Sequence, residues 1–163
     1  MIVIALGANL PSHAGEAAAT LKAALQMLAR RGVQIKQVSQ FYSSPAWPDP
    51  KDPPFVNAAA RIETALTPRA LLALLHEVET EFGRKRSVRN APRSLDLDII
   101  DYDGRMEEGS PTLPHPRMES RAFVLVPLAE IAPGWRHPVS GRTVEEMIAA
   151  LPAEKGEIRR LGY

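Results

Sequence analysis

Two aspartates that alternate with apolar residues directly follow a strongly basic segment of this chain. Asp96 and Asp98 alternate with Leu95, Leu97 and Ile99. In a strand the side-chain period is two, so both carboxylates point to one face of a sheet and the apolar side chains point to the other. Neighbouring carboxylates repel each other unless a cation lies between them, and aspartate is disfavoured in strands. The pattern therefore predicts a site for a hard divalent cation, Mg²⁺ above all.

The basic segment supplies partners for the ligands that such a cation brings. Five cations fall between residues 84 and 93, namely Arg84, Lys85, Arg86, Arg89 and Arg93. Guanidinium groups bind phosphate oxygens through paired hydrogen bonds, so a polyphosphate bound to Mg²⁺ fits beside the aspartates. An amphipathic strand with its polar face in water, after a solvated basic loop, would give the same pattern. The position of Arg93, two residues before Leu95, favours the metal and polyphosphate interpretation.

Composition limits the other classes of function. The chain has 163 residues, 45% of them hydrophobic, which is enough for one domain over residues 1–163 with a real core. The net charge of +1 argues against a general nucleic-acid binder. The chain has no cysteine, which excludes disulfides and thiolate sites and is compatible with a cytoplasmic location. Residues 1–6 are too short for a signal peptide or membrane span, so we expect no membrane association, and a single compact domain weakly favours a monomer.

The hydrophobic pattern predicts strands and helices that position the aspartates. Strands are expected at 1–6, 33–42, 55–63 and 94–100, the last closed by a turn at 103–104. One helix carries an apolar stripe over 21–28 and ends at Gly32, and a second begins at Thr67 and Pro68 and ends at Gly83. The order β-α-β-β-α-β predicts an α+β, ferredoxin-like antiparallel sheet with both helices on one face. Short helices over 126–131 and 143–151 should follow, and the pattern is compatible with an extra strand at 158–161.

Two loops flank this predicted core and could cover a site. Residues 45–54 contain five prolines and cannot join a sheet. Residues 84–93 form the basic segment. We expect both loops to be mobile without ligand and ordered by it, because lids of active sites behave in this way.

Several motifs resemble those of one known family. Residues 90–98 and the pair 114–117 and 121–125 resemble the two signatures of 6-hydroxymethyl-7,8-dihydropterin pyrophosphokinase. Further matching segments are residues 7–10, 41–45, 55–58 and 127–133, so the resemblance covers nearly the whole chain. It implies a ferredoxin-like enzyme of folate biosynthesis that transfers pyrophosphate from MgATP to the hydroxymethyl group of a reduced pterin and releases AMP.

The resemblance implies roles for individual residues. Asp96 and Asp98 would hold two Mg²⁺ ions that arrive with ATP. The implied catalytic residues are Arg84, Arg93, Asp96, Asp98, His115 and Arg121. The implied ATP-binding residues are Glu79, Arg84, Arg86, Arg89, Arg93, Ile99, Thr112, His115 and Arg121. As a hypothesis, Asp98 accepts the proton of the attacking hydroxymethyl group, because an unaided primary alcohol is a poor nucleophile at neutral pH.

A pterin is a flat heteroaromatic ring, so its site should offer aromatic faces and an amide in an apolar slot. Phe55 and Phe123 match the family positions that sandwich the ring, and Asn57 matches the amide. A phenylalanine in a strand is more often part of a core. An amide within an apolar strand must find a partner, however, which favours the binding interpretation. The implied pterin-binding set is Ser44, Pro45, Trp47, Phe55, Asn57 and Phe123.

Four positions depart from the family pattern. Asn90 stands where many members have a tryptophan that helps to cover the closed site, and Pro116, Ala8 and Pro11 are also unusual. These departures bear on loop closure and substrate affinity more than on the reaction.

Two alternative functions remain open at this point. An RNA-recognition module shares the strand order, but residues 2–6 contain no aromatic residue for stacking on bases. A metal-dependent nucleotidyltransferase could use the same aspartates and would release pyrophosphate rather than AMP.

Overall fold

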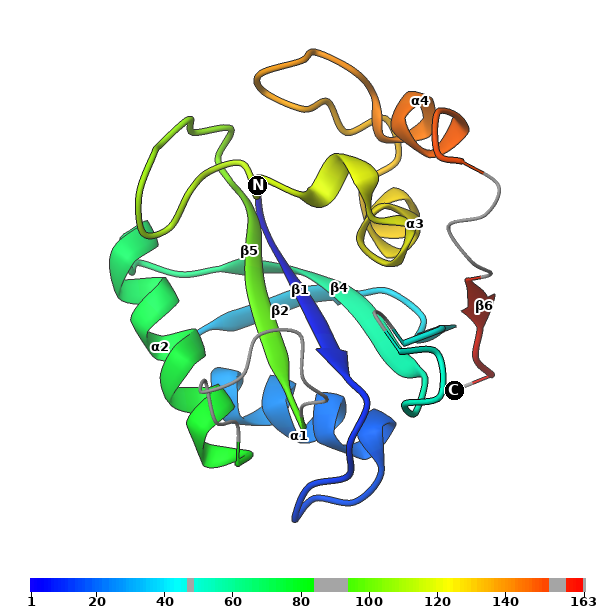
Figure 1. Cartoon of the computed structure of the whole chain (residues 1–163). Coiled ribbons are helices and arrows are strands. Elements are labelled where there is room, and N and C mark those ends of the chain that lie inside the picture. The colour runs from blue at the N-terminus through cyan, green and yellow to red at the C-terminus, as the bar shows by residue number, and fades with distance from the viewer. Residues whose placement is uncertain (47–48, 84–93, 153–157, 163) are drawn as a thin grey trace.

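The computed structural model describes residues 1–46, 49–83, 94–152 and 158–162, which form one antiparallel sheet between two layers of helices (Figure 1). The strands are β1 (Ile2–Ala8), β2 (Gln34–Val38), β3 (Tyr42–Ser44), β4 (Phe55–Glu63), β5 (Asp96–Tyr102) and β6 (Arg159–Arg160). Their order across the sheet is β5-β1-β4-β3-β6, and β2 pairs with the other end of β4. The long central strands β1 and β4 are therefore flanked by the short strands and by the strand that carries the aspartates.

Two helices cover one face of the sheet. They are α1 (Ala17–Arg30) and α2 (Pro68–Glu81), and their apolar stripes pack on Ile4 and Leu6 of β1 in the larger core. The Thr67 hydroxyl caps α2 by accepting a hydrogen bond of 3.2 Å from the Ala70 N–H. Glycines in the left-handed region follow both helices, at Gly32 and Gly83, as the sequence predicts.

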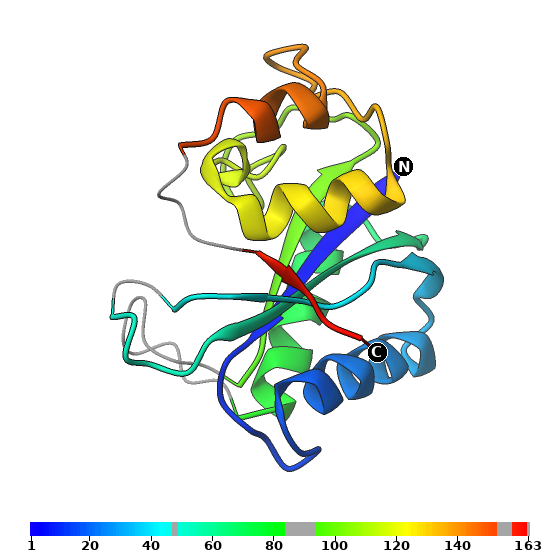
Figure 2. The same cartoon turned by 90° about the vertical axis from the view of Figure 1, so that its right-hand side faces the viewer.

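A second layer covers part of the opposite face (Figure 2). It consists of a short 3₁₀ turn (Met118–Ser120), α3 (Ala122–Ile131) and α4 (Val144–Ala149). Their apolar side chains form a second core with Val3, Ala59 and Ile100 of the sheet. No helix among the described residues is both long and apolar enough to cross a membrane. The mixed α+β class with an antiparallel sheet is confirmed, whereas the finer ferredoxin-like assignment stays a prediction.

The predicted strand over 33–42 is wrong in one respect, because it is divided into β2 and β3. Ser39 lies at the break. Its N–H donates to the Ala59 carbonyl at 2.9 Å, while its hydroxyl accepts from the Ala59 N–H at 3.0 Å and donates to the Gln40 carbonyl. The Ser39 hydroxyl thus takes the place of a backbone carbonyl as the partner of the Ala59 N–H, and the backbone pairing of β2 with β4 ends there. The predicted later elements are confirmed with shifted ends, since α3 begins at Ala122 and α4 ends at Ala149.

A bulge in β5 separates the part of the strand that carries Asp96 and Asp98 from the part that carries Asp101. Val3 pairs with Asp101 and Ile4 with Ile99, so Ile100 is the extra residue. Ahead of the bulge, the even-numbered aspartates share one face, and Leu95, Leu97 and Ile99 enter the core beneath α1 and α2. This alternation confirms the prediction for β5. After the bulge, the Asp101 carboxylate accepts a hydrogen bond of 2.9 Å from the Trp135 indole and so anchors the second layer.

Candidate active site

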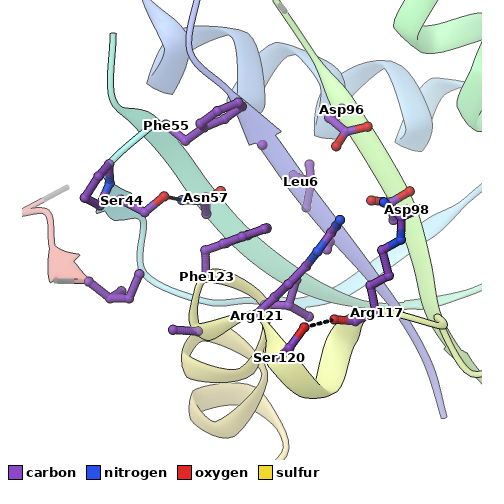
Figure 3. A pocket seen from close by; sticks show the side chains of 16 residues that line it. Leu6, Ser44, Phe55, Asn57, Asp96, Asp98, Arg117, Ser120, Arg121 and Phe123 are labelled. Carbon is purple, nitrogen blue, oxygen red and sulfur yellow. Dashed lines mark hydrogen bonds between the residues drawn. The ribbon is translucent and has the colours of Figure 1, made fainter. Parts of the chain in front are cut away.

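A pocket of about 380 Å³ lies on the sheet face that α3 only partly covers (Figure 3). It is lined by residues from β1, β3, β4, β5, the segment before α3, the start of α3 and the residue before β6. These residues are Ala5, Leu6, Gly7, Ser44, Pro45, Phe55, Asn57, Asp96, Asp98, Arg117, Ser120, Arg121, Ala122, Phe123, Val124 and Ile158. One end of the pocket is charged, and the other end is aromatic and carries an amide.

Strand β1 forms the floor between these ends. Gly7 pairs with Asp96 on one side and with Asn57 on the other, so the three residues form one row across the sheet. A Cβ atom at Gly7 would lie 3.3 Å from the Asn57 Oδ1 and 3.9 Å from the Phe55 ring. Glycine therefore keeps the floor low between the carboxylates and the amide.

Replacing Gly7 by alanine should weaken binding of a ligand that lies over this floor. The added methyl group would press on the Asn57 amide and rise into the pocket, and overpacking of this kind costs about 1–3 kcal/mol. We expect the KM for the substrate whose ring lies over Gly7 to rise about tenfold. The control is Gly162→Ala, because no atom lies within 4 Å of a Cβ there. An unchanged KM in Gly7→Ala would show that the ligand does not lie over Gly7.

The charged end is built around β5 and the segment that precedes α3. Asp96 and Asp98 line the pocket and are half-buried. The His115 Nε2 lies 3.8 Å from the Asp98 Oδ2, and the His115 N–H donates to the Ile100 carbonyl at 3.2 Å. The His115 Nδ1 accepts a hydrogen bond of 3.2 Å from the Arg117 N–H. In the neutral imidazole the proton therefore resides on Nε2, which can donate to an oxygen beside Asp98.

Burial, together with the nearby Arg121 and Arg117 cations, lowers the pKa of His115 to about 4, although the Asp96 carboxylate opposes the shift. The imidazole is thus neutral at pH 7. Between pH 6.5 and 4, His115 binds a proton in the unfolded chain but not in the folded protein. This difference makes the free energy of unfolding fall as the pH is lowered, by up to roughly 3 kcal/mol.

The titration of His115 in the metal-free protein should show this directly by NMR. We expect its ring signals to stay constant from pH 8 to about pH 5, and the acid-induced loss of stability to be smaller in His115→Asn. A His115 midpoint near the ordinary value of 6.5 would contradict the lowered pKa.

Arg117 and Arg121 complete the charged end. Figure 3 shows both side chains extending from the segment before α3 across the pocket toward β5. The Arg121 guanidinium lies 5.5 Å from the centre of the Phe123 ring, in a cation–π contact. Carboxylates on one wall and guanidinium groups on the other are suited to a metal-bound polyphosphate, because each group meets opposite charge in the ligand.

The aromatic end offers one amide between two rings. The Asn57 Nδ2 donates a hydrogen bond of 2.7 Å to the Ser44 hydroxyl, which fixes the orientation of the amide. Phe55 of β4 and Phe123 of α3 lie on either side of Asn57 in Figure 3. Phe123 is 36% exposed and lines the pocket, so part of its ring is open to a ligand. This end suits a flat ring with hydrogen-bonding groups along its edge.

Four of the predicted ATP-binding residues that the structure describes do not line the pocket. One is His115, which lies beside Asp98, and the others are Glu79, Ile99 and Thr112. Glu79 is buried on α2, and its carboxylate accepts a hydrogen bond of 2.8 Å from the Leu97 N–H, between the two aspartates. Ile99 lies in the core under the helices, and the Thr112 hydroxyl donates to the Gly109 carbonyl at 2.9 Å. Their ATP-binding roles stay predictions. Other predicted residues fall outside the described part of the chain, namely Trp47, Arg84, Arg86, Arg89 and Arg93.

The structure also brings to the pocket residues that the sequence reasoning did not assign. Gly7 and Ala5 form its floor, Arg117 stands beside Arg121, and Ile158 comes from the far C-terminal end. The decreasing size of Val3, Ala5 and Gly7 along one face of β1 was the available signal for the floor. Arg117 lay within a recognised motif, whereas nothing in the sequence placed Ile158.

The donor set fits Mg²⁺ that arrives with a ligand. Among the residues that the structure describes, no three acidic or histidine side chains gather around one point. Among the described residues that line the pocket, Asp96 and Asp98 are the two that carry carboxylates. Magnesium is commonly bound by one or two carboxylates, with phosphates and water completing its six oxygen ligands.

A pocket with these two ends is typical of an enzyme that brings a phosphate-bearing substrate to a flat ring. A family model described as 7,8-dihydro-6-hydroxymethylpterin-pyrophosphokinase matches residues 3–133. The chain therefore belongs to the 7,8-dihydro-6-hydroxymethylpterin-pyrophosphokinase family, as the motifs predict, and is an enzyme, a diphosphotransferase.

Three similar proteins carry the name 2-amino-4-hydroxy-6-hydroxymethyldihydropteridine pyrophosphokinase. The protein of Synechocystis sp. is 40% identical over 148 residues, which cover 90% of this chain and 73% of that protein. The protein of Methylorubrum extorquens is 41% identical over 145 residues, covering 88% and 90%. The protein of Pseudomonas aeruginosa is 39% identical over 155 residues, covering 94% and 93%.

Proposed function

We propose that this enzyme transfers pyrophosphate from ATP to the hydroxymethyl group of 6-hydroxymethyl-7,8-dihydropterin in folate synthesis, with Mg²⁺ and with release of AMP. Family membership supports the transfer itself. The observation that carries the division of roles is a pocket that joins two carboxylates and two guanidinium groups to two aromatic rings and an amide. ATP occupies the charged end and the pterin occupies the aromatic end.

The reaction is an in-line displacement at the β-phosphorus. The hydroxymethyl oxygen forms a bond to this phosphorus, and the bond from the phosphorus to the oxygen that bridges to the α-phosphate breaks. AMP leaves with that bridging oxygen. The Asp98 carboxylate takes up the proton of the hydroxymethyl group. The products are the pterin pyrophosphate, AMP and one proton.

The residues of the charged end position ATP and stabilise the charge of the transferring group. Asp96 and Asp98 would hold two Mg²⁺ ions, which supply charge neutralisation for the triphosphate. Arg121 and Arg117 donate to phosphate oxygens from the opposite wall, and the His115 Nε2–H donates a further hydrogen bond. Because the Arg121 guanidinium contacts the Phe123 ring and the His115 Nδ1 accepts from the Arg117 N–H, these two donors need little reorganisation when charge develops.

The aromatic end recognises the pterin by its shape and its edge. Phe55 and Phe123 stack on the two faces of the ring. The Asn57 amide, whose orientation Ser44 fixes, presents Oδ1 and its second N–H hydrogen to the donor and acceptor edge of the ring. Pro45 closes the apolar slot beside Ser44. The pterin then lies over Gly7 with its hydroxymethyl group directed to the aspartates.

Product analysis separates this function from a nucleotidyltransferase that uses the same aspartates. The enzyme is incubated with Mg²⁺, the pterin and ATP labelled on the γ-phosphorus. We expect the label in the pterin product and an equal amount of unlabelled AMP. Labelled free pyrophosphate, with AMP joined to the acceptor, would identify a nucleotidyltransferase, and ADP would identify transfer of a single phosphate.

The expectations of one domain over residues 1–163, a monomeric state and a cytoplasmic location stay predictions.

A further inference from the structure

A residue beyond the family match forms part of the pocket. The family model ends at residue 133, yet Ile158 lines the pocket with Ser44, Pro45 and Phe55. Ile158 directly precedes β6, the short strand at the edge of the sheet beyond β3. Figure 2 shows β6 near the C-terminus of the chain, and Ile158 connects this strand to the pocket.

The register of β6 explains how Ile158 reaches the pocket. Tyr42 pairs with Arg160 and Ser43 with Arg159 in antiparallel register. Continued by one residue, this register sets Ile158 opposite Ser44, which itself pairs with Phe55. Partners in an antiparallel ladder point to the same face. Phe55, Ser44 and Ile158 thus form a row beside the row of Gly7 and Asn57.

Hydrogen bonds hold this edge of the sheet in place. The Leu161 N–H donates to the Phe41 carbonyl at 2.7 Å, on the far side of β6 from Ile158. The Tyr42 hydroxyl donates to the Glu130 carboxylate of α3, and burial with this contact raises the pKa of Tyr42 to about 12. The Glu130 carboxylate also accepts from the Gln40 N–H at 2.9 Å. These contacts fix β3 against both β6 and α3.

We propose that Ile158 is a specificity-determining residue that closes the acceptor end of the pocket with an apolar wall. The proposal rests on the proposed function, since it places the pterin at that end. Ser44 and Asn57 offer polar groups to the edge of the ring, whereas Ile158 offers only methyl and methylene groups. A branched apolar side chain there limits the length of the slot and excludes water from the hydrogen bonds of Asn57.

Steady-state kinetics of Ile158→Ala test the proposal. We expect the KM for 6-hydroxymethyl-7,8-dihydropterin to rise about tenfold, because truncating a wall of an apolar pocket by methyl groups has effects of this size. The KM for ATP and kcat should stay within twofold of wild type, since Ile158 lies away from the charged end. Equilibrium binding of the fluorescent oxidised ligand 6-hydroxymethylpterin should weaken by a similar factor.

Leu161→Ala provides the matched control on the same segment. Leu161 packs against the main core rather than into the pocket, so its truncation loosens β6 without removing a wall. An equal rise in the pterin KM in both variants would mean that Ile158 only holds the strand, which would overturn the proposal. An unchanged pterin KM in Ile158→Ala would overturn it as well.

The wild-type arm separates this inference from the proposed function. If the wild-type enzyme forms AMP with the pterin and Ile158→Ala behaves identically, the inference fails alone. If the wild-type enzyme forms no AMP with the pterin, the proposed function itself fails and the assignment of Ile158 falls with it.

Discussion

Asp98→Asn should lower kcat/KM by about 1,000-fold while leaving the protein folded and as stable as wild type. An amide is a poor ligand for Mg²⁺ and cannot take up the proton of the hydroxymethyl group, so a loss of about 4 kcal/mol of transition-state stabilisation is expected. The free energy of unfolding should change little, because the substitution also removes a negative charge beside Asp96. Kinetics at several Mg²⁺ concentrations, with urea denaturation of the same samples, measure both quantities.

Asp101→Asn on the same strand is the control, because it should lower stability and leave activity unchanged. The Asp101 carboxylate accepts hydrogen bonds of 2.9 Å from the Gly104 N–H and from the Trp135 indole. An amide would direct an N–H group at one of these donors, which costs about 1–3 kcal/mol of stability. Its kcat/KM should stay near that of wild type. If Asp98→Asn keeps full Mg²⁺-dependent turnover, Asp98 is neither a metal ligand nor the proton acceptor.

Arg121→Ala should lower kcat/KM by about 100-fold, since it removes a charged donor aimed at the phosphates. Arg121→Lys should recover only part of the loss, because an ammonium group cannot make the paired hydrogen bonds of a guanidinium. The variant has a second readout that needs no substrate. The Arg121 cation helps to lower the pKa of His115, so this pKa should rise in Arg121→Ala when it is followed by NMR.

Arg105→Ala is the matched control for this variant. The Arg105 guanidinium lies 5.0 Å from the centre of the Tyr102 ring, a cation–π contact like that of Arg121, but it does not line the pocket. Its removal should leave kcat/KM and the pKa of His115 unchanged. Equal losses of activity in the two variants would assign the effect of Arg121 to stability or net charge and not to phosphate binding.

The parts of the site that depend on local pattern could be predicted from the sequence. The alternation of Asp96 and Asp98 with leucines fixes their common face, because the strand period alone determines it. Thr67 and Pro68 likewise mark the start of α2 within the chain itself. For Asn57, Phe55 and Phe123 the residue type and the family motifs were enough to place them at the aromatic end of the pocket.

The parts that depend on register between distant segments could not be predicted in this way. Gly7 matters because it stands between Asp96 and Asn57, and these pairings are not visible in residues 1–10. Ser39 divides a continuous strand pattern because its hydroxyl meets the Ala59 backbone from another strand. Ile158 reaches the pocket only through the pairing of β6 with β3. Each of these features requires the folded sheet.

Glu79 illustrates a role that neither local pattern nor family motif specified. Its buried carboxylate accepts a hydrogen bond from the Leu97 N–H. This N–H lies on the edge of β5 that faces away from the neighbouring strand β1. The residues on either side of Leu97 are the two aspartates of the charged end. The contact thus supports the position of β5 at the pocket, from the side of α2 rather than from within the site.

The most direct test of the account is a crystal structure of the enzyme with Mg²⁺, a non-hydrolysable ATP analogue and 6-hydroxymethyl-7,8-dihydropterin. We predict metal density between the triphosphate and the carboxylates of Asp96 and Asp98. We also predict the pterin ring between Phe55 and Phe123, with its edge on Asn57 and its hydroxymethyl oxygen facing the β-phosphorus. Triphosphate or pterin bound outside this pocket, or metal held without either aspartate, would contradict the account.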